Sequence, residues 1–320
     1  MKRAFTSLIA VVLAMLPSFG QSAYPDVNML VDEPETLMAG HKTEIIFYAL
    51  PNGNSIEWTA GKKMEEGDDW HFDIQHIAAQ TAYLRTLRPS DNIITVYLMS
   101  AQKAWNTWDK QHADIAADTY KSIISEMVNK YAEYKPTVTI NSHSGGGYLI
   151  FNYFRRVDEI DPAITRLAFI DSTYGYETET HFDKFISWLR DPKHSLSVIS
   201  YEDVTVILDG KPLVSQEGGT WGRSHRMIKD FSEYFKFRSY VETLPGKISE
   251  PSPAEETEVE FYRAGGGRIS FKLLRNPDGN IWHTVMVEKN GFIDADLTGT
   301  RREGKGYVFW GPRAYIDYIK

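Results

Sequence analysis

The segment Thr137 to Gly147 (TVTINSHSGGG) contains the residues best suited to chemistry. A run of β-forming residues leads into a turn of small residues, and an apolar stretch with helical character follows. This is the setting of a nucleophile elbow, in which the central residue is strained and the residues two before and two after must be small. Ser144 takes the central place, with Ser142 and Gly146 flanking it. The alternatives are a plain glycine-rich turn or a phosphate cradle, but no Lys stands in the P-loop position.

A serine nucleophile needs a general base, and the base of such a site follows the last strand of the sheet. His283 lies in a polar loop nine residues after the apolar run that ends at Leu274. The sequence therefore predicts His283 as the base. His225 is the alternative, in which case His283 would be an ordinary surface residue.

The acid that orients the base has two candidates, each directly after a predicted strand. Asp203 follows the strand that ends near Tyr201, which is the usual place, and we expect it to be the acid. Asp171 ends the preceding strand, a position from which some lipases take their acid. Each of the two is otherwise read as a helix cap or a turn residue.

An oxyanion hole needs two backbone N–H groups aimed at the developing negative charge. The first is expected from Gly145, directly after the nucleophile. The second is expected from Asn52, because the preceding Pro51 has no N–H. The chemistry is then a two-step acyl transfer through Ser144 that requires neither a metal nor a cofactor.

The elements that position these residues alternate between strand and helix from about residue 43 to 295. We expect strands, helices and one hairpin at the following places: strands 45–50, 93–99, 136–141, 166–170, 196–201 and 268–274, helices 73–88, 115–131, 147–155 and 182–189, and a hairpin at 206–213. This order predicts an α/β fold with a mostly parallel sheet and helices on both faces. Residues 21–320 are expected to form one domain with an insertion at about 204–258, before the last strand.

Composition narrows the class of protein. The 320 residues include 42% hydrophobic and 24% charged residues, which is typical of a globular protein, and the net charge of −8 argues against a nucleic-acid binder. The chain has no Cys, which excludes disulfides, thiol nucleophiles and zinc–thiolate sites. His71 and His76 are not a metal pair, because a spacing of five does not place them on one helical face; we expect them to close the floor of the site with Gln75.

The first 20 residues resemble a secretory signal peptide, with Lys2 and Arg3 before an apolar stretch and small residues before a cut at Gln21. An uncleaved anchor is the alternative. No later stretch is long enough to span a membrane. The sequence therefore predicts an exported protein, in the periplasm or outside a bacterial cell.

Several segments, taken together, resemble the α/β-hydrolase fold and, within it, a bacterial family of exported serine esterases that includes gut-bacterial pectin methylesterases. They are Ala49–Asn54, Asp69–His76, the Ser144 turn, Phe169–Tyr176, Gly218–Ser224 and His283–Gly291. The usual Gly-His-Ser lead-in is replaced by Ser142-His143-Ser144. The resemblance implies hydrolysis of a galacturonate methyl ester, with methanol as the leaving group.

Residues suited to a sugar substrate accompany the expected site. Trp70 and Trp221 could offer flat faces to sugar rings, and Arg223 could bind a uronate carboxylate. Core packing and surface charge are the alternative roles. Other functions stay open: an acetyl esterase on glycans, a serine peptidase, or an inactive hydrolase fold that binds glycans. A lipase fits less well, because the insertion is too charged to cover a lipid.

Overall fold

The computed structural model describes residues 24–245 and 256–320. The predicted signal peptide, residues 1–20, lies outside the described residues, as do residues 246–255 of the expected insertion. Within the described part, no helix is both long and apolar enough to cross a bilayer.

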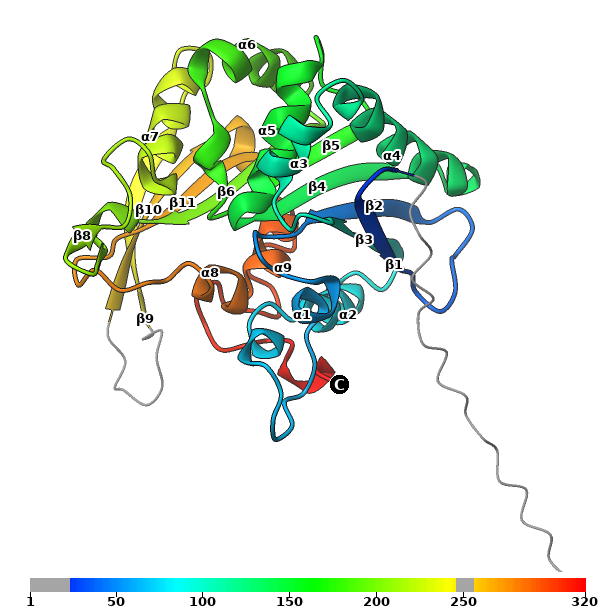
Figure 1. Cartoon of the computed structure of the whole chain (residues 1–320), viewed down its shortest axis with the longest axis horizontal. Coiled ribbons are helices and arrows are strands. Elements are labelled where there is room, and N and C mark those ends of the chain that lie inside the picture. Colours follow the sequence, from blue (N-terminus) through cyan, green and yellow to red (C-terminus); the bar gives the residue numbers. More distant parts are fainter. Residues whose placement is uncertain (1–23, 246–255) are drawn as a thin grey trace, which may run out of the picture.

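One nine-stranded sheet runs through the described residues in the order β1-β3-β2-β4-β5-β6-β11-β10-β9 (Figure 1). Its strands are β1 (Val27–Asp32), β2 (Lys42–Ala49), β3 (Asp91–Ser100), β4 (Thr137–His143), β5 (Ile164–Ile170), β6 (Ser195–Tyr201), β9 (Arg238–Pro245), β10 (Glu256–Ala264) and β11 (Ile269–Leu274). The six strands from β3 to β11 in this order pair in parallel. β1 at one edge and β10 and β9 at the other pair antiparallel.

Helices cover both faces of this sheet. They are α1 (Ile56–Ala60), α2 (Ile77–Leu87), α3 (Trp105–Gln111), α4 (Ala116–Lys130), α5 (Gly147–Arg156), α6 (Thr178–Leu189), α7 (Thr220–Phe231), α8 (Val285–Glu288) and α9 (Gly291–Leu297). Figure 1 shows α3 to α7 on one side of the sheet and α1, α2, α8 and α9 on the other.

The central strands are apolar because both of their faces are buried. In β2, the side chains of Ile45 and Phe47 enter the core under α3 to α7, whereas those of Ile46 and Tyr48 enter the core on the opposite face. Alternate residues of a strand point to opposite faces, so a strand covered on both sides must be apolar throughout. The parallel order and the two helical layers confirm the predicted α/β-hydrolase fold.

The structure corrects the predicted helix at 73–88. A short 3-10 turn, η1 (Trp70–Asp73), comes first, and α2 starts only at Ile77. Between them His76 adopts the left-handed conformation, with φ of 47°, and its ring lies 2.8 Å from Asp73. A helix cannot continue through such a residue, so the apolar periodicity spans two separate elements.

The segment expected as an insertion contains more regular structure than the sequence indicated. The predicted hairpin is confirmed as β7 (Ile207–Leu208) and β8 (Lys211–Pro212), joined by Asp209 and Gly210, both at positive φ. After it come the unpredicted α7 and β9. Because β10 and β9 pair beyond β11, the last strand in the sequence lies inside the sheet and not at its edge.

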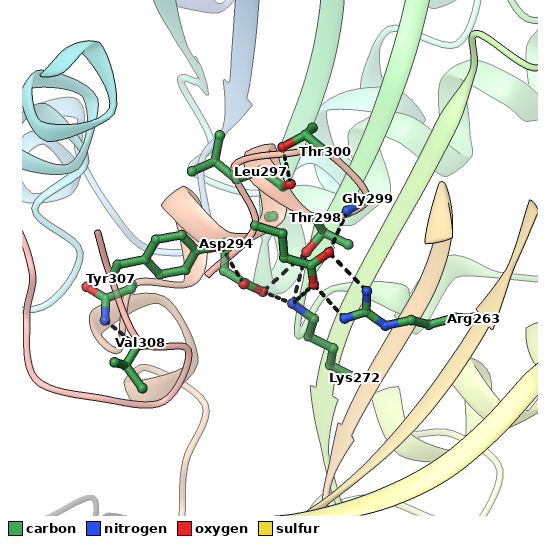
Figure 2. Close-up of polar contacts among 12 residues, drawn as sticks. Arg263, Lys272, Asp294, Leu297, Thr298, Gly299, Thr300, Tyr307 and Val308 are labelled. Carbon is green, nitrogen blue, oxygen red and sulfur yellow. Dashed lines mark hydrogen bonds and ion pairs between the residues drawn. The ribbon is translucent and has the colours of Figure 1, made fainter. Parts of the chain in front are cut away.

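A buried ionic cluster attaches α9 and the following loop to the sheet (Figure 2). Lys272 of β11 is only 2% exposed, and its ammonium lies 2.6 Å from Asp294 and 3.1 Å from Glu303. Glu303 also pairs with Arg263 of β10, and Thr298 accepts from Lys272. Removing one member would leave buried charges unpaired, which is costly. The cluster therefore fixes α9 against β11.

Candidate active site

Ser144 lies in a strained turn between β4 and α5. Its φ is 55°, in the left-handed region that non-glycine residues rarely occupy. The chain leaves the strand at His143, makes the 3-10 turn η3 (Ser144–Gly146), and enters α5 at Gly147. This is the backbone conformation expected of the central residue of a nucleophile elbow, which projects its side chain from the end of the sheet.

The residues that flank Ser144 are small because neighbouring chain approaches closely. A Cβ on Gly146 would lie 2.1 Å from the carbonyl oxygen of Ala49. Ser142, which stands where a first Gly is usual, is fully buried, and its hydroxyl lies 2.8 Å from that of Ser172. A serine is tolerated at this position because the turn after β5 supplies a hydrogen-bond partner.

His283 is held by Asp171. The two lie at the ends of different loops, and His283 Nδ1 is 2.5 Å from Asp171 Oδ2. Asp171 is fully buried and has a φ of 44°, so the turns after the adjacent strands β4 and β5 both contain a left-handed residue. The His283 side chain keeps 27% of its surface exposed. A carboxylate that accepts from Nδ1 leaves Nε2 as the nitrogen able to take a proton.

His143 holds the backbone of the loop that carries His283. Its ring Nε2 lies 2.9 Å from the carbonyl oxygen of His283, and the two rings are 4.8 Å apart. Burial, followed by the charge of His283, lowers the pKa of His143 to about 3, so this ring stays neutral and donates from Nε2. His143 therefore positions the backbone that carries the candidate base.

Asp203 does not contact His283 in this structure. Its Oδ2 accepts from the backbone N–H of Thr220 at 2.7 Å and its Oδ1 from that of Trp221 at 3.4 Å, so it caps the start of α7. The hydroxyl of Thr220 connects the two acids, because it donates to Asp171 and lies 3.3 Å from Asp203. The sequence favoured Asp203 as the acid, but in the structure the alternative, Asp171, pairs with His283.

The two carboxyl groups affect one another. Burial, followed by the charge of Asp171, raises the pKa of Asp203 to about 7. Thr220 has one hydroxyl proton, and it donates that proton to Asp171. Asp203 thus acts on Asp171 only through Thr220 and through its charge.

The loop after β2 brings Asn52 against the nucleophile turn. A Cβ on Gly145 would lie 2.2 Å from Asn52 Oδ1, so the side chain of Asn52 rests directly on Gly145. The next two amides are occupied, since Gly53 donates to Lys103 and Asn54 to Pro51. In the described part of the chain, the N–H of Asn52 has no hydrogen-bond partner. This amide is where the sequence predicts the second oxyanion donor.

Tyr174 is a residue of the site that the sequence did not indicate. It lies three residues after Asp171, and its ring faces His283 at 6.5 Å, edge to face. Burial, with further contributions from Asp171 and Asp203, raises its pKa well above the usual value. A neutral phenol therefore forms one wall beside the candidate base. No spacing rule for bases or acids points to this position or to Thr220.

Trp70 is the exposed end of an aromatic stack. It is 63% exposed, and its ring stacks on His71 at 3.9 Å, which in turn stacks on Trp58 at 4.3 Å. The ammonium of Lys103 lies 5.0 Å from the Trp58 ring, and the Lys103 carbonyl accepts from Gly53. The stack is thus attached to the Asn52 loop.

Trp221 and Arg223, the other predicted substrate residues, make contacts within the protein. Trp221 is partly buried at the start of α7, and the guanidinium of Arg275 lies 5.2 Å from its ring. Arg223 donates to the carbonyl of Tyr176 at 2.8 Å. One guanidinium nitrogen of Arg223 is therefore used inside the fold, whereas Nε is buried without a hydrogen-bond partner in the described residues.

The other histidines considered have different partners. His225 pairs with Glu260 at 3.4 Å and with the Trp221 carbonyl, and neither candidate acid contacts it. His71 pairs with Asp69, and His76 with Asp73. Gln75 accepts from Tyr48 at 2.9 Å and donates to Asn54 at 3.4 Å, so its side chain contacts the loop that contains Asn52. Within residues 24–245 and 256–320, no cluster of potential metal ligands occurs.

No protein-family model matches the chain, and no curated protein matches it in sequence. Among solved structures, it is similar to a thermostable esterase at 13% identity and a TM-score of 0.44, over 85% of this chain. The chain spans 59% of the length of that esterase.

Two further solved structures are similar over smaller parts of the fold. One is an acetyl xylan esterase from Aspergillus awamori, at 9% identity and a TM-score of 0.38, over 78% of this chain and 88% of that one. The other is an acylaminoacyl peptidase from Pyrococcus horikoshii, at 13% identity and a TM-score of 0.31, over 66% and 34%. The sheet order and the geometry around Ser144 are therefore the basis for assigning a function.

Proposed function

We propose that this protein is a serine-dependent carboxylic ester hydrolase. The observation that carries the proposal is the combination of Ser144 in a left-handed turn with His283 held at 2.5 Å by the buried Asp171. An inactive fold has no need to keep a strained serine and an oriented histidine together, because both are costly features. This combination therefore favours an enzyme over a glycan-binding protein.

In the proposed reaction, Ser144 Oγ attacks the ester carbonyl carbon while His283 Nε2 takes the hydroxyl proton. Asp171 holds the tautomer of His283 and stabilises its positive charge. The N–H groups of Gly145 and Asn52 stabilise the oxyanion. The tetrahedral species then expels the alcohol, which receives its proton from His283, and the acyl group remains on Ser144. Water, deprotonated by His283, attacks this acyl-enzyme, and the second tetrahedral species releases the acid as His283 returns the proton to Ser144 Oγ.

We propose esterified plant-wall polysaccharide as the substrate, with the methyl ester of galacturonate in pectin as the reacting group. The exposed Trp70 face, supported by the stack beside the Asn52 loop, is suited to bind a sugar ring. The sequence segments that resemble exported pectin methylesterases support the methyl ester. The N-terminal 20 residues support export, and the proposal places the enzyme outside the cytoplasm.

Methanol release from highly methylated pectin tests this proposal, with the Ser144→Ala variant as control. Release by the wild type alone would support it. Acetate release from acetylated xylan without methanol release would replace pectin by an acetyl ester and keep the serine hydrolase. Cleavage of peptide amides, with neither ester cleaved, would contradict the esterase assignment.

A further inference from the structure

A cavity of about 220 Å³ opens at the amino-terminal ends of the central strands, which is the end of the sheet opposite Ser144. Lys42, Thr137 and Ser195 line it, and each is the first residue of its strand (β2, β4 and β6). Ser144 and Asp171 instead follow the carboxyl ends of β4 and β5. Thr165 also lines the cavity, at the other end of β5 from Asp171, so about 20 Å of strand separates the two sites at ~3.3 Å per residue.

The cavity has an excess of positive charge in an acidic protein. Its lining contains six cationic side chains and three carboxylates, although the whole chain has a net charge of −8. The cations are Lys42, Arg88, Arg166, Lys193, Arg301 and Arg302.

One buried arginine uses all three carboxylates of the lining. Arg88, whose side chain is 6% exposed, pairs with Glu44 at 2.7 Å, Asp91 at 2.9 Å and Asp296 at 2.8 Å. Even so, Arg88 Nη2 and Asp296 Oδ1 are buried without a hydrogen-bond partner in the described residues. The floor of the cavity is thus polar and rigid, with hydrogen-bonding capacity left over.

The cations of the lining outnumber its carboxylates by three, six against three, although Lys42 and Arg166 also attract the charge of Glu44. Apart from Arg88, none of these cations forms an ion pair within the described part of the chain. Arg166 is fixed in place because Nη1 donates to the carbonyls of Ala295 at 3.2 Å and Thr298 at 3.0 Å, which leaves its other guanidinium nitrogens unused. Lys193 and Arg301 are exposed at the mouth. Clustered cations repel one another, so an anion that neutralises them is expected to bind.

We propose that this cavity binds a single multivalent oxyanion of the phosphate or sulfate class. Its volume is room for about seven waters at ~30 Å³ each, which suits a small anion or one sulfated or phosphorylated sugar and not a polymer chain. Guanidinium and ammonium groups bind such oxyanions by charge-assisted hydrogen bonds. The excess of three cations over carboxylates in the lining favours a multivalent anion over a single carboxylate.

Thermal unfolding and titration calorimetry on the purified mature chain test this proposal. Phosphate and sulfate should raise Tm saturably beyond sodium chloride of equal ionic strength, because a ligand of the folded state stabilises it. The double variant Lys193→Ala/Arg301→Ala, at exposed positions that leave the core intact, should bind on the order of tenfold more weakly for each lost charge-assisted hydrogen bond. Lys121→Ala, an exposed lysine on α4, is the matched control and should bind as the wild type does.

The remaining comparisons separate the sources of the anion and the two sites. Tighter binding of galactose 6-sulfate or glucose 6-phosphate than of the free anions would identify a saccharide ester as the ligand, and the reverse would identify the free anion. Ser144→Ala should bind unchanged. The proposal is overturned by a Tm rise that chloride reproduces, by undiminished binding in the double variant, or by acetate binding as tightly as phosphate.

Discussion

Replacing Asp171 by Asn should nearly abolish turnover, whereas the same change at Asp203 should not. In the wild type, Asp171 Oδ2 faces Nδ1 of His283 and Oδ1 accepts from Thr220. An Asn at position 171 must turn its NH₂ group toward either His283 or Thr220, and both of these are donors in the wild type. It also removes the charge that stabilises the imidazolium, which at an effective dielectric constant of ~20 and about 4 Å between charge centres amounts to about 4 kcal/mol.

That loss alone corresponds to about 10³-fold in rate, and the wrong tautomer of His283 extends it toward about 10⁴-fold in kcat/KM. Asp203→Asn keeps an oxygen for one of the two α7 amides, and Asn is itself a good cap, so we expect a loss within about tenfold. Hydrolysis of p-nitrophenyl acetate by both variants measures the difference. Equal losses, or a larger loss for Asp203→Asn, would refute the assignment of Asp171 as the acid.

Three further predictions concern stability and pH. Gly146→Ala should destabilise the fold by about 3 kcal/mol in chemical denaturation, because its Cβ would lie 2.1 Å from the backbone oxygen of Ala49; unchanged stability would show that the turn can relax. The raised pKa of Asp203, about 7 against 3.8, means that the folded state binds this proton more tightly than the unfolded state does. Its contribution to the unfolding free energy should therefore fall as pH rises from 3.8 to about 7, and Asp203→Asn should remove that fall; an identical pH profile in both proteins would count against it. Lys272→Met should cost about 3–5 kcal/mol, since it leaves Asp294 buried without its cation, and a loss below about 1 kcal/mol would contradict the structural role of the cluster.

The sequence was sufficient to predict the parts of the fold that local pattern determines. The apolar runs of β2, β3, β4, β5, β6 and β11 and the small residues around Ser144 led to the observed strands and to the observed turn. β10 and β9 were missed because their place depends on pairing with a strand that comes later in the chain. α7 was missed because its charged residues hid the buried positions Ser224, Met227 and Phe231.

The choice between the two acids lay beyond what spacing can decide. Both Asp171 and Asp203 follow the carboxyl end of a strand, where the residues of such a site are expected. The two acids differ in their contact with α7. This helix begins 17 residues after Asp203, and its first amides bind the Asp203 carboxylate. Thr220, which connects the two acids, is visible as important only once these elements are brought together.

The most direct test of the central claim is labelling of the purified protein with a fluorophosphonate, followed by intact and peptide mass spectrometry. An activated serine attacks such a reagent and keeps it, because the phosphonylated product resembles the tetrahedral intermediate. We predict one adduct per chain, on Ser144, absent from Ser144→Ala and strongly slowed in His283→Ala. An unlabelled wild-type chain, or an adduct on a different serine, would contradict the account.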